Sequence, residues 1–294
     1  MTQPALHRHQ WSVASFRVDG DRPTMLQRCA CGAERVVPAW DRSWAPPAAW
    51  RLVGGAVPRL AGRLMVPVAP LPGPESVNEA IKVDAWSDVA CPWCYIGKRN
   101  LEAGIAAYGG AVDVEYRSFE LAPDTPIDFE GSERDYLMRI KGISAGEADA
   151  MHQRVAVIAA EVGLRYDFAS VKHTRTVKAH QLMHYAKARS LQQEVAERLF
   201  SAYFVEGRHI GRDESLAELA AEIGLDGSDV LRALRAEEHL ADVRADQQQA
   251  ISFGIRGVPF FVLDRRYALS GAQPPETFAA ALGTVAEERS ALRG

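Results

Sequence analysis

The sequence contains few cysteines, little net charge and no long apolar segment, and each of these absences excludes a class of protein. Its 294 residues include four cysteines in two close pairs, which do not make the disulfide framework of a secreted protein. No run of about 18 apolar residues occurs, so we expect no transmembrane helix. The formal net charge of -4 offers no basic surface for nucleic acid or anionic membranes. Residues 1–10 lack the apolar core of a signal peptide, so we expect a cytoplasmic protein that binds neither nucleic acid nor membrane.

The stretch 81–108 combines a strand, a turn and a helix, with two thiols at the junction. Apolar residues alternate from Ile81 to Ala85, as in a buried strand, and Cys91-Pro92-Trp93-Cys94 follows a short polar break. Behind the second cysteine, apolar residues recur with the period of an amphipathic helix, which Gly109-Gly110 ends. We therefore expect Cys91 and Cys94 in the first turn of a helix.

This position favours redox chemistry. A sulfur at a helix N-terminus faces unpaired N–H groups and the positive end of the helix dipole, which favour the nucleophilic thiolate. We expect Cys91, at the exposed tip, to attack and Cys94, one turn inside, to resolve the mixed disulfide. Pro92 suits the first helical position because its missing N–H would have no partner there. Trp93 should shape the surface between the thiols and tune their redox poise.

Three other interpretations of the two cysteines compete with this one: half of a zinc site, a static disulfide, or two packed thiols without a function. No second Cys-x-x-Cys or nearby pair of histidines completes a zinc site in this part of the chain. A cytosolic protein rarely keeps a static disulfide. The placement of the motif between a strand and a helix favours the redox interpretation.

Residues 1–40 predict a separate small β unit, with strands near 11–18 and 25–29. The pattern His7, His9, Cys29 and Cys31 contains the four ligands of a tetrahedral zinc site, although Cys-x-Cys is shorter than the usual knuckle. The alternative is a reduced thiol pair without a metal. Residues 41–76 are rich in proline, alanine and glycine, and this composition predicts an extended linker.

The order of the remaining elements predicts an α/β fold. A second strand is expected at 112–121, helices fill 133–235, and a helix at about 241–253 precedes strands at 257–263 and 267–269 and a closing helix from Pro274. Ser144 to Glu147 form a capping box, and we expect Asp213 and Ser228 to cap two later helices. This order is that of a thioredoxin fold, 77–125 and 238–294, interrupted by an all-helical insertion, 126–237.

The dipeptide Val258-Pro259 is the second chemical element. Proline lacks the N–H that a sheet ladder needs, so it belongs at the first residue of a strand or at a special bend. X-Pro is also the bond type in which the cis form is inexpensive. We expect a cis Pro259 that presents the Val258 backbone beside Cys91, where a substrate backbone can pair with it. The alternative is an ordinary trans proline that opens an edge strand.

The sequence resembles the DsbA-like thioredoxin-fold oxidoreductases, in their FrnE-type subgroup. The resemblance implies that Cys91 is the nucleophile, Cys94 the resolving thiol and Pro259 the cis-proline. Arg175 stands where the family usually has asparagine. The segments that carry the resemblance are 87–98, 119–123, 179–180, 202–204, 254–261 and 270–274.

The resemblance also defines the expected partners. These are protein or low-molecular-weight thiols and disulfides, with glutathione among the candidates, and no cofactor beyond the redox-active disulfide is expected. Pro92, Trp93, Val258 and His180 are candidate substrate-binding residues, although a packed core histidine is the simpler interpretation of His180. Asp88 either assists proton transfer or caps the turn.

Two alternative functions remain open. A related branch of glutathione-dependent isomerases and transferases, which includes the 2-hydroxychromene-2-carboxylate isomerases, acts on small aromatic or polyketide-like molecules but typically has serine at the position of Cys91. Cys91 and Cys94 together favour disulfide exchange over that chemistry. The non-enzymatic alternative is a zinc-linked binding module, in which residues 1–40 recruit a partner.

Overall fold

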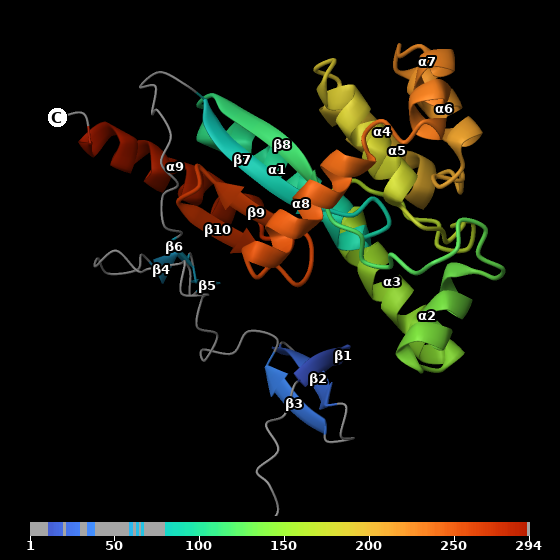
Figure 1. Ribbon diagram of the computed structural model, residues 1–294. Coiled ribbons are helices and arrows are strands. Elements are labelled where there is room, and N and C mark those ends of the chain that lie inside the picture. The colour runs from blue at the N-terminus through green and yellow to red at the C-terminus, as the bar shows by residue number, and fades with distance from the viewer. Residues whose placement is uncertain are drawn as a thin grey trace, which may run out of the picture.

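The structure, a computed structural model, describes residues 80–292 with their side chains and the backbone of six earlier strands (Figure 1). β1, β2 and β3 form an antiparallel sheet, as expected for a small N-terminal β unit. β4 pairs with β5. The six strands are β1 (Trp11–Asp19), β2 (Arg22–Cys29), β3 (Glu34–Pro38), β4 (Arg59–Leu60), β5 (Arg63–Leu64) and β6 (Val66–Pro67).

The main sheet has the strand order β6-β10-β9-β7-β8. β7 (Ile81–Ser87) pairs in parallel with β8 (Val112–Ser118) and antiparallel with β9 (Phe260–Leu263), which forms a hairpin with β10 (Tyr267–Ser270). β6 pairs with the outer edge of β10. Two residues of the segment predicted as a linker therefore extend the sheet, which composition alone does not indicate.

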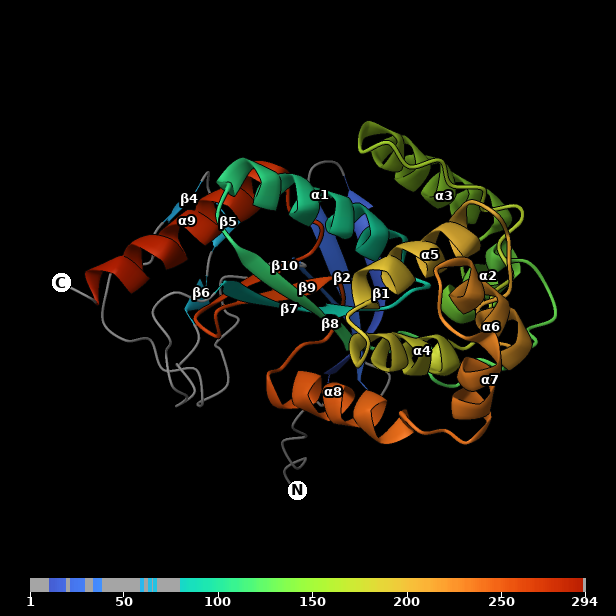
Figure 2. The ribbon, with the colours of Figure 1, turned by 90° about the horizontal axis from the view of Figure 1, so that it is seen from above.

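Helices cover both faces of this sheet (Figure 2). α1 (Pro92–Tyr108) and α9 (Pro275–Ala291) lie on one face and α8 (Leu240–Ser252) on the other. Ile81, Val83 and Ala85 alternate along β7 and are at most 3% exposed, in one core with residues of α1 and α9. Trp86 belongs to the smaller core under α8, where its Nε1 donates to the carbonyl of Asp246 at 3.2 Å. This is the alternation that a strand covered on both faces requires.

Six helices form an insertion between β8 and α8. Gln192, the first residue of α5, fixes the insertion to the sheet, because its side chain bonds the N–H and the carbonyl of Tyr116 on the edge strand β8, at 2.9 and 3.0 Å. The helices are α2 (Glu133–Lys141), α3 (Ala145–Glu161), α4 (Val177–Lys187), α5 (Gln192–Phe204), α6 (Asp213–Glu222) and α7 (Gly227–Arg235). The mixed α/β fold with a helical insertion agrees with the fold class predicted from the sequence.

Helix caps agree with the sequence in one case and differ in two. The capping box of Ser144 and Glu147 opens α3 as predicted. Asp213 is instead the first residue of α6, after an N-cap at Arg212 without a side-chain hydrogen bond. α7 is capped by Asp226, whose side chain accepts from the N–H of Ser228, so Ser228 is not the cap. Within the described residues, no helix has the length and hydrophobicity needed to span a bilayer.

Candidate functional site: a dithiol beside Val258 and Pro259

Cys91 and Cys94 occupy the first turn of α1. Cys91 is the N-cap residue, Pro92 is the first helical residue, and no side-chain hydrogen bond caps this helix. The N–H of Cys91 donates to Asp88 and the N–H of Cys94 donates to Cys91, both at 3.0 Å, so the turn is held by its own backbone. Both cysteines are free thiols. Because Cys91 is the N-cap residue, its side chain stands at the positive end of the helix dipole.

The expectation of an exposed Cys91 is wrong. Cys91 is 4% exposed and Cys94 2%, whereas Trp93 between them is 38% exposed. The carbonyl oxygen of Val258 lies 3.7 Å from the Cys91 sulfur, and Tyr166 of the insertion also reaches the turn, where its hydroxyl donates to the carbonyl of Pro92 at 2.7 Å. Of the residues in the motif, Trp93 is therefore the most exposed to solvent, and the sulfur of Cys91 is buried.

The Val258–Pro259 peptide bond is cis. The thiol of Cys91 lies 3.7 Å from the carbonyl oxygen of Val258, in a position to donate to it. Gly97 of α1 makes the close approach of this segment feasible, since a Cβ there would lie 3.0 Å from Cγ of Pro259. The structure thus brings together Cys91, Cys94, Pro92, Val258 and Pro259.

The two thiols have different surroundings. Burial, and then the neighbouring Cys91, raise the pKa of the Cys94 thiol well above its usual value. Lys141, at the end of α2, lies within electrostatic range of Cys91 and Glu133; burial nevertheless lowers the pKa of its amino group. The insertion therefore places the Lys141 amino group within electrostatic range of Cys91, whereas burial and the raised pKa of Cys94 favour its thiol form.

Asp88 organises the turn between β7 and α1. Its carboxylate accepts the N–H of Ala90 at 3.2 Å and that of Leu121 at 2.7 Å, and lies 3.6 Å from Nε2 of His180. Burial acts to raise the pKa of the Asp88 carboxyl, but the contact with His180 and the two N–H groups outweigh it and keep this pKa below its usual value. The expected turn cap is thus present, and it also holds the loop after β8.

His180 differs from its expected position. It is 3% exposed and lies in the interior behind the turn, so it offers no surface to a substrate in this structure. Arg175 lies closer to the surface and pairs with Glu120 at 3.0 Å; the same carboxylate accepts from Gln247 of α8 at 3.0 Å. This polar group joins segment 119–123 to the insertion.

Sequence reasoning missed three residues that position the motif: Tyr166, Gly97 and Ser87. No local pattern marks Tyr166, whose role depends on a contact with Pro92, 74 positions away. Ser87 lies in the polar break before the motif, but the sequence does not show that it is buried, 7% exposed, near the Cys94 thiol. A glycine one turn behind a Cys-x-x-Cys motif was an available signal for close packing.

The predicted zinc site lies outside the described side chains. His7, His9 and Cys31 are not among the described residues, and of Cys29 only its backbone place at the end of β2 is described. Within the part of the chain whose side chains are described, no cluster of three or more histidine, cysteine, aspartate or glutamate residues has metal-binding geometry. Zinc binding by the N-terminal unit therefore stays a prediction.

The profile of the DSBA-like thioredoxin domain matches residues 82–283 of the chain. The chain belongs to this family. It is 40% identical to a probable DsbA oxidoreductase of Streptomyces coelicolor, with a TM-score of 0.66, covering 71% of this chain and 90% of the other.

Two other members of the comparison are more distant. An uncharacterized protein of Bacillus subtilis, YwbO, is 29% identical over 192 residues, which are 62% of this chain and 86% of YwbO. A cytosolic disulfide reductase of Pseudomonas aeruginosa, DsbM, is 23% identical with a TM-score of 0.50, covering 69% of this chain and 97% of the other. At that identity, the likeness to DsbM establishes the DSBA-like fold alone.

Proposed function

We propose that this DSBA-like protein is a thiol–disulfide oxidoreductase in which Cys91 is the nucleophile and Cys94 the resolving thiol. The Cys91 thiolate attacks one sulfur of a substrate disulfide, forms a mixed disulfide and releases the first substrate thiolate. Cys94 then attacks the Cys91 sulfur, forms the Cys91–Cys94 disulfide and releases the second thiolate. The substrate gains two electrons and the protein dithiol loses them; the reverse sequence oxidises a substrate dithiol.

One observation carries the proposal: the Cys91 thiol is directed at the carbonyl of Val258, next to Pro259. A bound peptide segment that pairs with the Val258 backbone would hold its own sulfur in line with Cys91. Pro92 and the exposed Trp93 would form the adjoining surface. We therefore assign the catalytic role to Cys91, Cys94 and Pro259 and the substrate contact to Pro92, Trp93 and Val258.

The substrate class follows from the same surface. The exposed Trp93 suits a protein substrate, and a small thiol such as glutathione is the second candidate. The structure of the reductase DsbM has been solved with glutathione, which makes glutathione a reasonable first probe.

We assign the protein to the FrnE-type subgroup on segments 87–98 and 254–261, and we propose a cytoplasmic location.

The glutathione-dependent isomerase is the alternative enzyme. Such a reaction needs a bound glutathione and one nucleophile or hydrogen-bond donor at position 91, but no second thiol. Cys94 has no role in it, whereas disulfide exchange requires Cys94. A non-enzymatic binding module would require neither Cys91 nor Cys94. Its predicted zinc site can be tested by measuring the metal content of the full chain and of a Cys29→Ser variant.

The test is reduction of insulin with dithiothreitol as the electron source. The wild-type chain should accelerate insulin precipitation, and Cys91→Ser should match the rate without protein. Cys94→Ala should accumulate mixed disulfides through Cys91, identifiable by mass spectrometry. A wild-type chain without exchange activity that binds glutathione tightly would favour the isomerase instead.

A further inference from the structure

Arg175, which precedes helix α4, is anchored by a buried carboxylate. Its Nε donates to Glu120 at 3.0 Å, and the Glu120 side chain is only 4% exposed. The other oxygen of this carboxylate accepts from Gln247 of α8, also at 3.0 Å. The Glu120 carboxylate is therefore held from two sides, and it fixes the guanidinium that is bonded to it.

The far end of the Arg175 guanidinium is open. An arginine side chain carries five N–H donors in one plane, and among the described residues only the Nε–H of Arg175 has an acceptor. The side chain is 39% exposed, so a solute can reach its two terminal nitrogens. Two parallel N–H groups of a guanidinium match the two oxygens of a carboxylate. Arg175 thus presents an oriented pair of donors to solvent.

Glu120 lies beside the turn that carries the nucleophile. The N–H groups of residues 119 and 121 donate to the carbonyl of Ser87 at 3.2 Å and to the carboxylate of Asp88 at 2.7 Å. The carbonyl of Asp88 in turn accepts from the N–H of Cys91 at 3.0 Å. Both chain neighbours of Glu120 are therefore bonded to the turn between β7 and α1.

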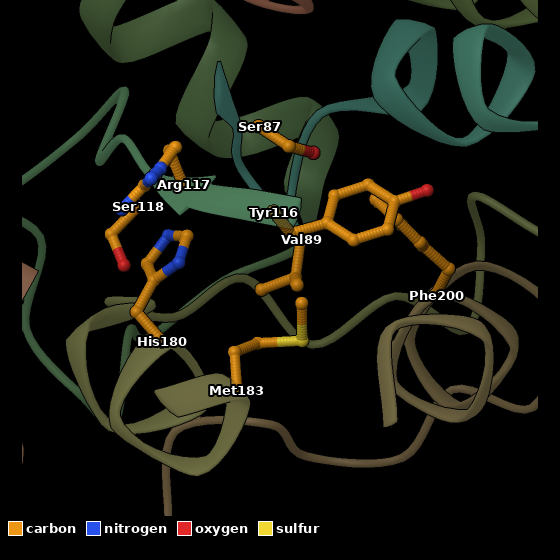
Figure 3. Close-up of a pocket in the computed structure, with 8 residues that line it drawn as sticks. All are labelled: Ser87, Val89, Tyr116, Arg117, Ser118, His180, Met183 and Phe200. Carbon is orange, nitrogen blue, oxygen red and sulfur yellow. The ribbon is translucent and has the colours of Figure 1, made fainter. Parts of the chain in front are cut away.

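Helix α4 approaches the same turn. Nε2 of His180, in α4, lies 3.6 Å from the Asp88 carboxylate. Figure 3 shows His180 projecting from α4 into a space that the ends of β7 and β8 also line. The two segments that carry Arg175 and Glu120 therefore converge on the turn that precedes Cys91.

We propose that Arg175 binds a carboxylate of a polypeptide substrate, supplied by an aspartate or glutamate close to the cysteine that Cys91 attacks. This inference rests on the proposed exchange reaction and names its substrate class. Leu121, next to Glu120, is 48% exposed and Trp93 is 38% exposed, so apolar side chains are also open to a polypeptide. Arg175 then determines specificity and takes no part in the covalent steps.

The interaction acts at short range. Glu120 compensates the charge of Arg175, so the pair attracts distant anions weakly, and the gain comes from charge-assisted hydrogen bonds at contact. Two other cations are less directed: Lys141, within electrostatic range of Cys91, and Arg256, exposed in the segment before β9. These two would favour an anion anywhere on the substrate, whereas Arg175 favours a carboxylate at one position.

The test uses peptides whose single cysteine is joined to thionitrobenzoate by a disulfide. The Cys91 thiolate bonds to the peptide sulfur, and thionitrobenzoate leaves with the electron pair of the broken bond and absorbs visible light. Each peptide carries a glutamate one or two residues before or after the cysteine and is compared with its glutamine counterpart. With the reduced full-length chain, one glutamate position should react about 3- to 10-fold faster than glutamine, and the others less than about twofold faster.

Variants separate the oriented guanidinium from charge alone. Arg175→Gln should lower the ratio of glutamate to glutamine rates to about one, and Arg175→Lys should keep only a small part of the preference, since an ammonium lacks the planar pair of donors. Arg265→Gln is the matched control, because it removes the same charge from an exposed arginine in the turn beyond the far end of β9. An unchanged ratio in Arg175→Gln, full preference in Arg175→Lys, or an equal loss in Arg265→Gln would overturn the assignment.

The peptide series on the unmodified chain does not depend on variant folding. Equal rates for all peptides, or equal acceleration by glutamate at every position, would refute the carboxylate site and leave the exchange reaction standing. No release of thionitrobenzoate from any peptide would refute the exchange reaction itself, and this inference with it. Oxidised glutathione is the last comparison. If Arg175→Gln slows its reduction while the peptides show no preference, Arg175 binds a small thiol and the polypeptide assignment is wrong.

Discussion

The sulfur of Cys91 lies 3.7 Å from the carbonyl oxygen of Val258, a residue 167 positions further along the chain. This contact joins the first strand–helix junction of the DSBA-like domain to the segment that enters β9 after the helical insertion. Cys91 therefore caps one helix and forms one side of the candidate site. Val258, which follows the helical insertion in the sequence, forms the other side. In the proposed exchange reaction, a substrate disulfide would displace this contact to reach the Cys91 sulfur.

The first prediction concerns the division of labour between the thiols. Because burial raises the pKa of the Cys94 thiol, this residue stays protonated at neutral pH and should react with iodoacetamide much more slowly than Cys91. The alkylation rate of Cys94 should keep rising into the alkaline range. Mass spectrometry of the labelled peptides over a pH series measures both rates. Superimposable profiles for the two residues would contradict the assignment.

The second prediction concerns Lys141. Its amino group is within electrostatic range of Cys91, so removing the charge by Lys141→Gln should slow the attack of Cys91 on a disulfide a few-fold, equivalent to roughly 0.5–1 kcal/mol. The effect should fade at high salt. Arg139→Gln, on the same helix, is the control, because the Arg139 guanidinium lies over the ring of Phe129 at 4.9 Å. If Lys141→Gln and Arg139→Gln slow the attack of Cys91 equally, the change in net charge explains the lower rate and Lys141 has no specific effect.

Local parts of the site could be predicted from the sequence and distant contacts could not. Alternation from Ile81 to Ala85 and the spacing of Cys91 and Cys94 place the thiols at a strand–helix junction, because those signals are read within one stretch. The depth of Cys91 depends on Val258 and Tyr166, which no local pattern links to it. An N-cap residue is exposed by default, and here other segments cover it.

The same limit explains the errors at His180 and at two helix caps. Helical spacing tells which face His180 shares with its neighbours, but not that β7 and β8 close over that face. At α7, Asp226 and Ser228 are both good capping residues, and the extended backbone of Asp226, with φ -71° and ψ 110°, decides between them. The pairing of β6 with β10 likewise depends on an available sheet edge, which the composition of segment 41–76 does not show.

The third prediction concerns Gly97, whose missing side chain lets Pro259 approach α1. A Cβ at Gly97 would lie 3.0 Å from Cγ of Pro259 and 3.3 Å from the ring of Phe261. Gly97→Ala should therefore destabilise the fold by about 1–3 kcal/mol and slow disulfide exchange, because the Val258 segment must shift away from Cys91. Thermal unfolding and the insulin assay measure the two effects. Gly283→Ala in α9 is the control: a Cβ there meets nothing within 4 Å, so stability should be unchanged or slightly higher.

The last prediction concerns Glu197 of α5, which anchors the first turns of α1 from behind. Its carboxylate accepts from the hydroxyl of Tyr95 at 2.6 Å and from Nζ of Lys98 at 2.7 Å, and the Lys98 side chain is 4% exposed. Tyr95 in turn stacks on Phe200 with ring centroids 4.9 Å apart. Glu197→Gln leaves the buried ammonium with Glu102 as its remaining acidic partner among the described residues. It should cost about 1–3 kcal/mol of unfolding free energy near pH 7.

The pH dependence of this cost separates the ion pair from mere packing. Burial acts to raise the pKa of the Glu197 carboxyl, but the bonds from Lys98 and Tyr95 outweigh it and lower this pKa below the usual value. A lowered folded-state pKa stabilises the protein above the unfolded value, near 4.3, and this contribution is lost as the pH falls through the folded value. The stability difference between wild type and Glu197→Gln should therefore be full at pH 7 and shrink below about pH 4. Glu222→Gln, which removes a half-exposed partner of Arg198 and Arg208, should cost less than about 1 kcal/mol. A Glu197→Gln cost that is the same at pH 7 and pH 3 would assign the effect to packing, and the anchoring of α1 would then rest on the Tyr95–Phe200 stack.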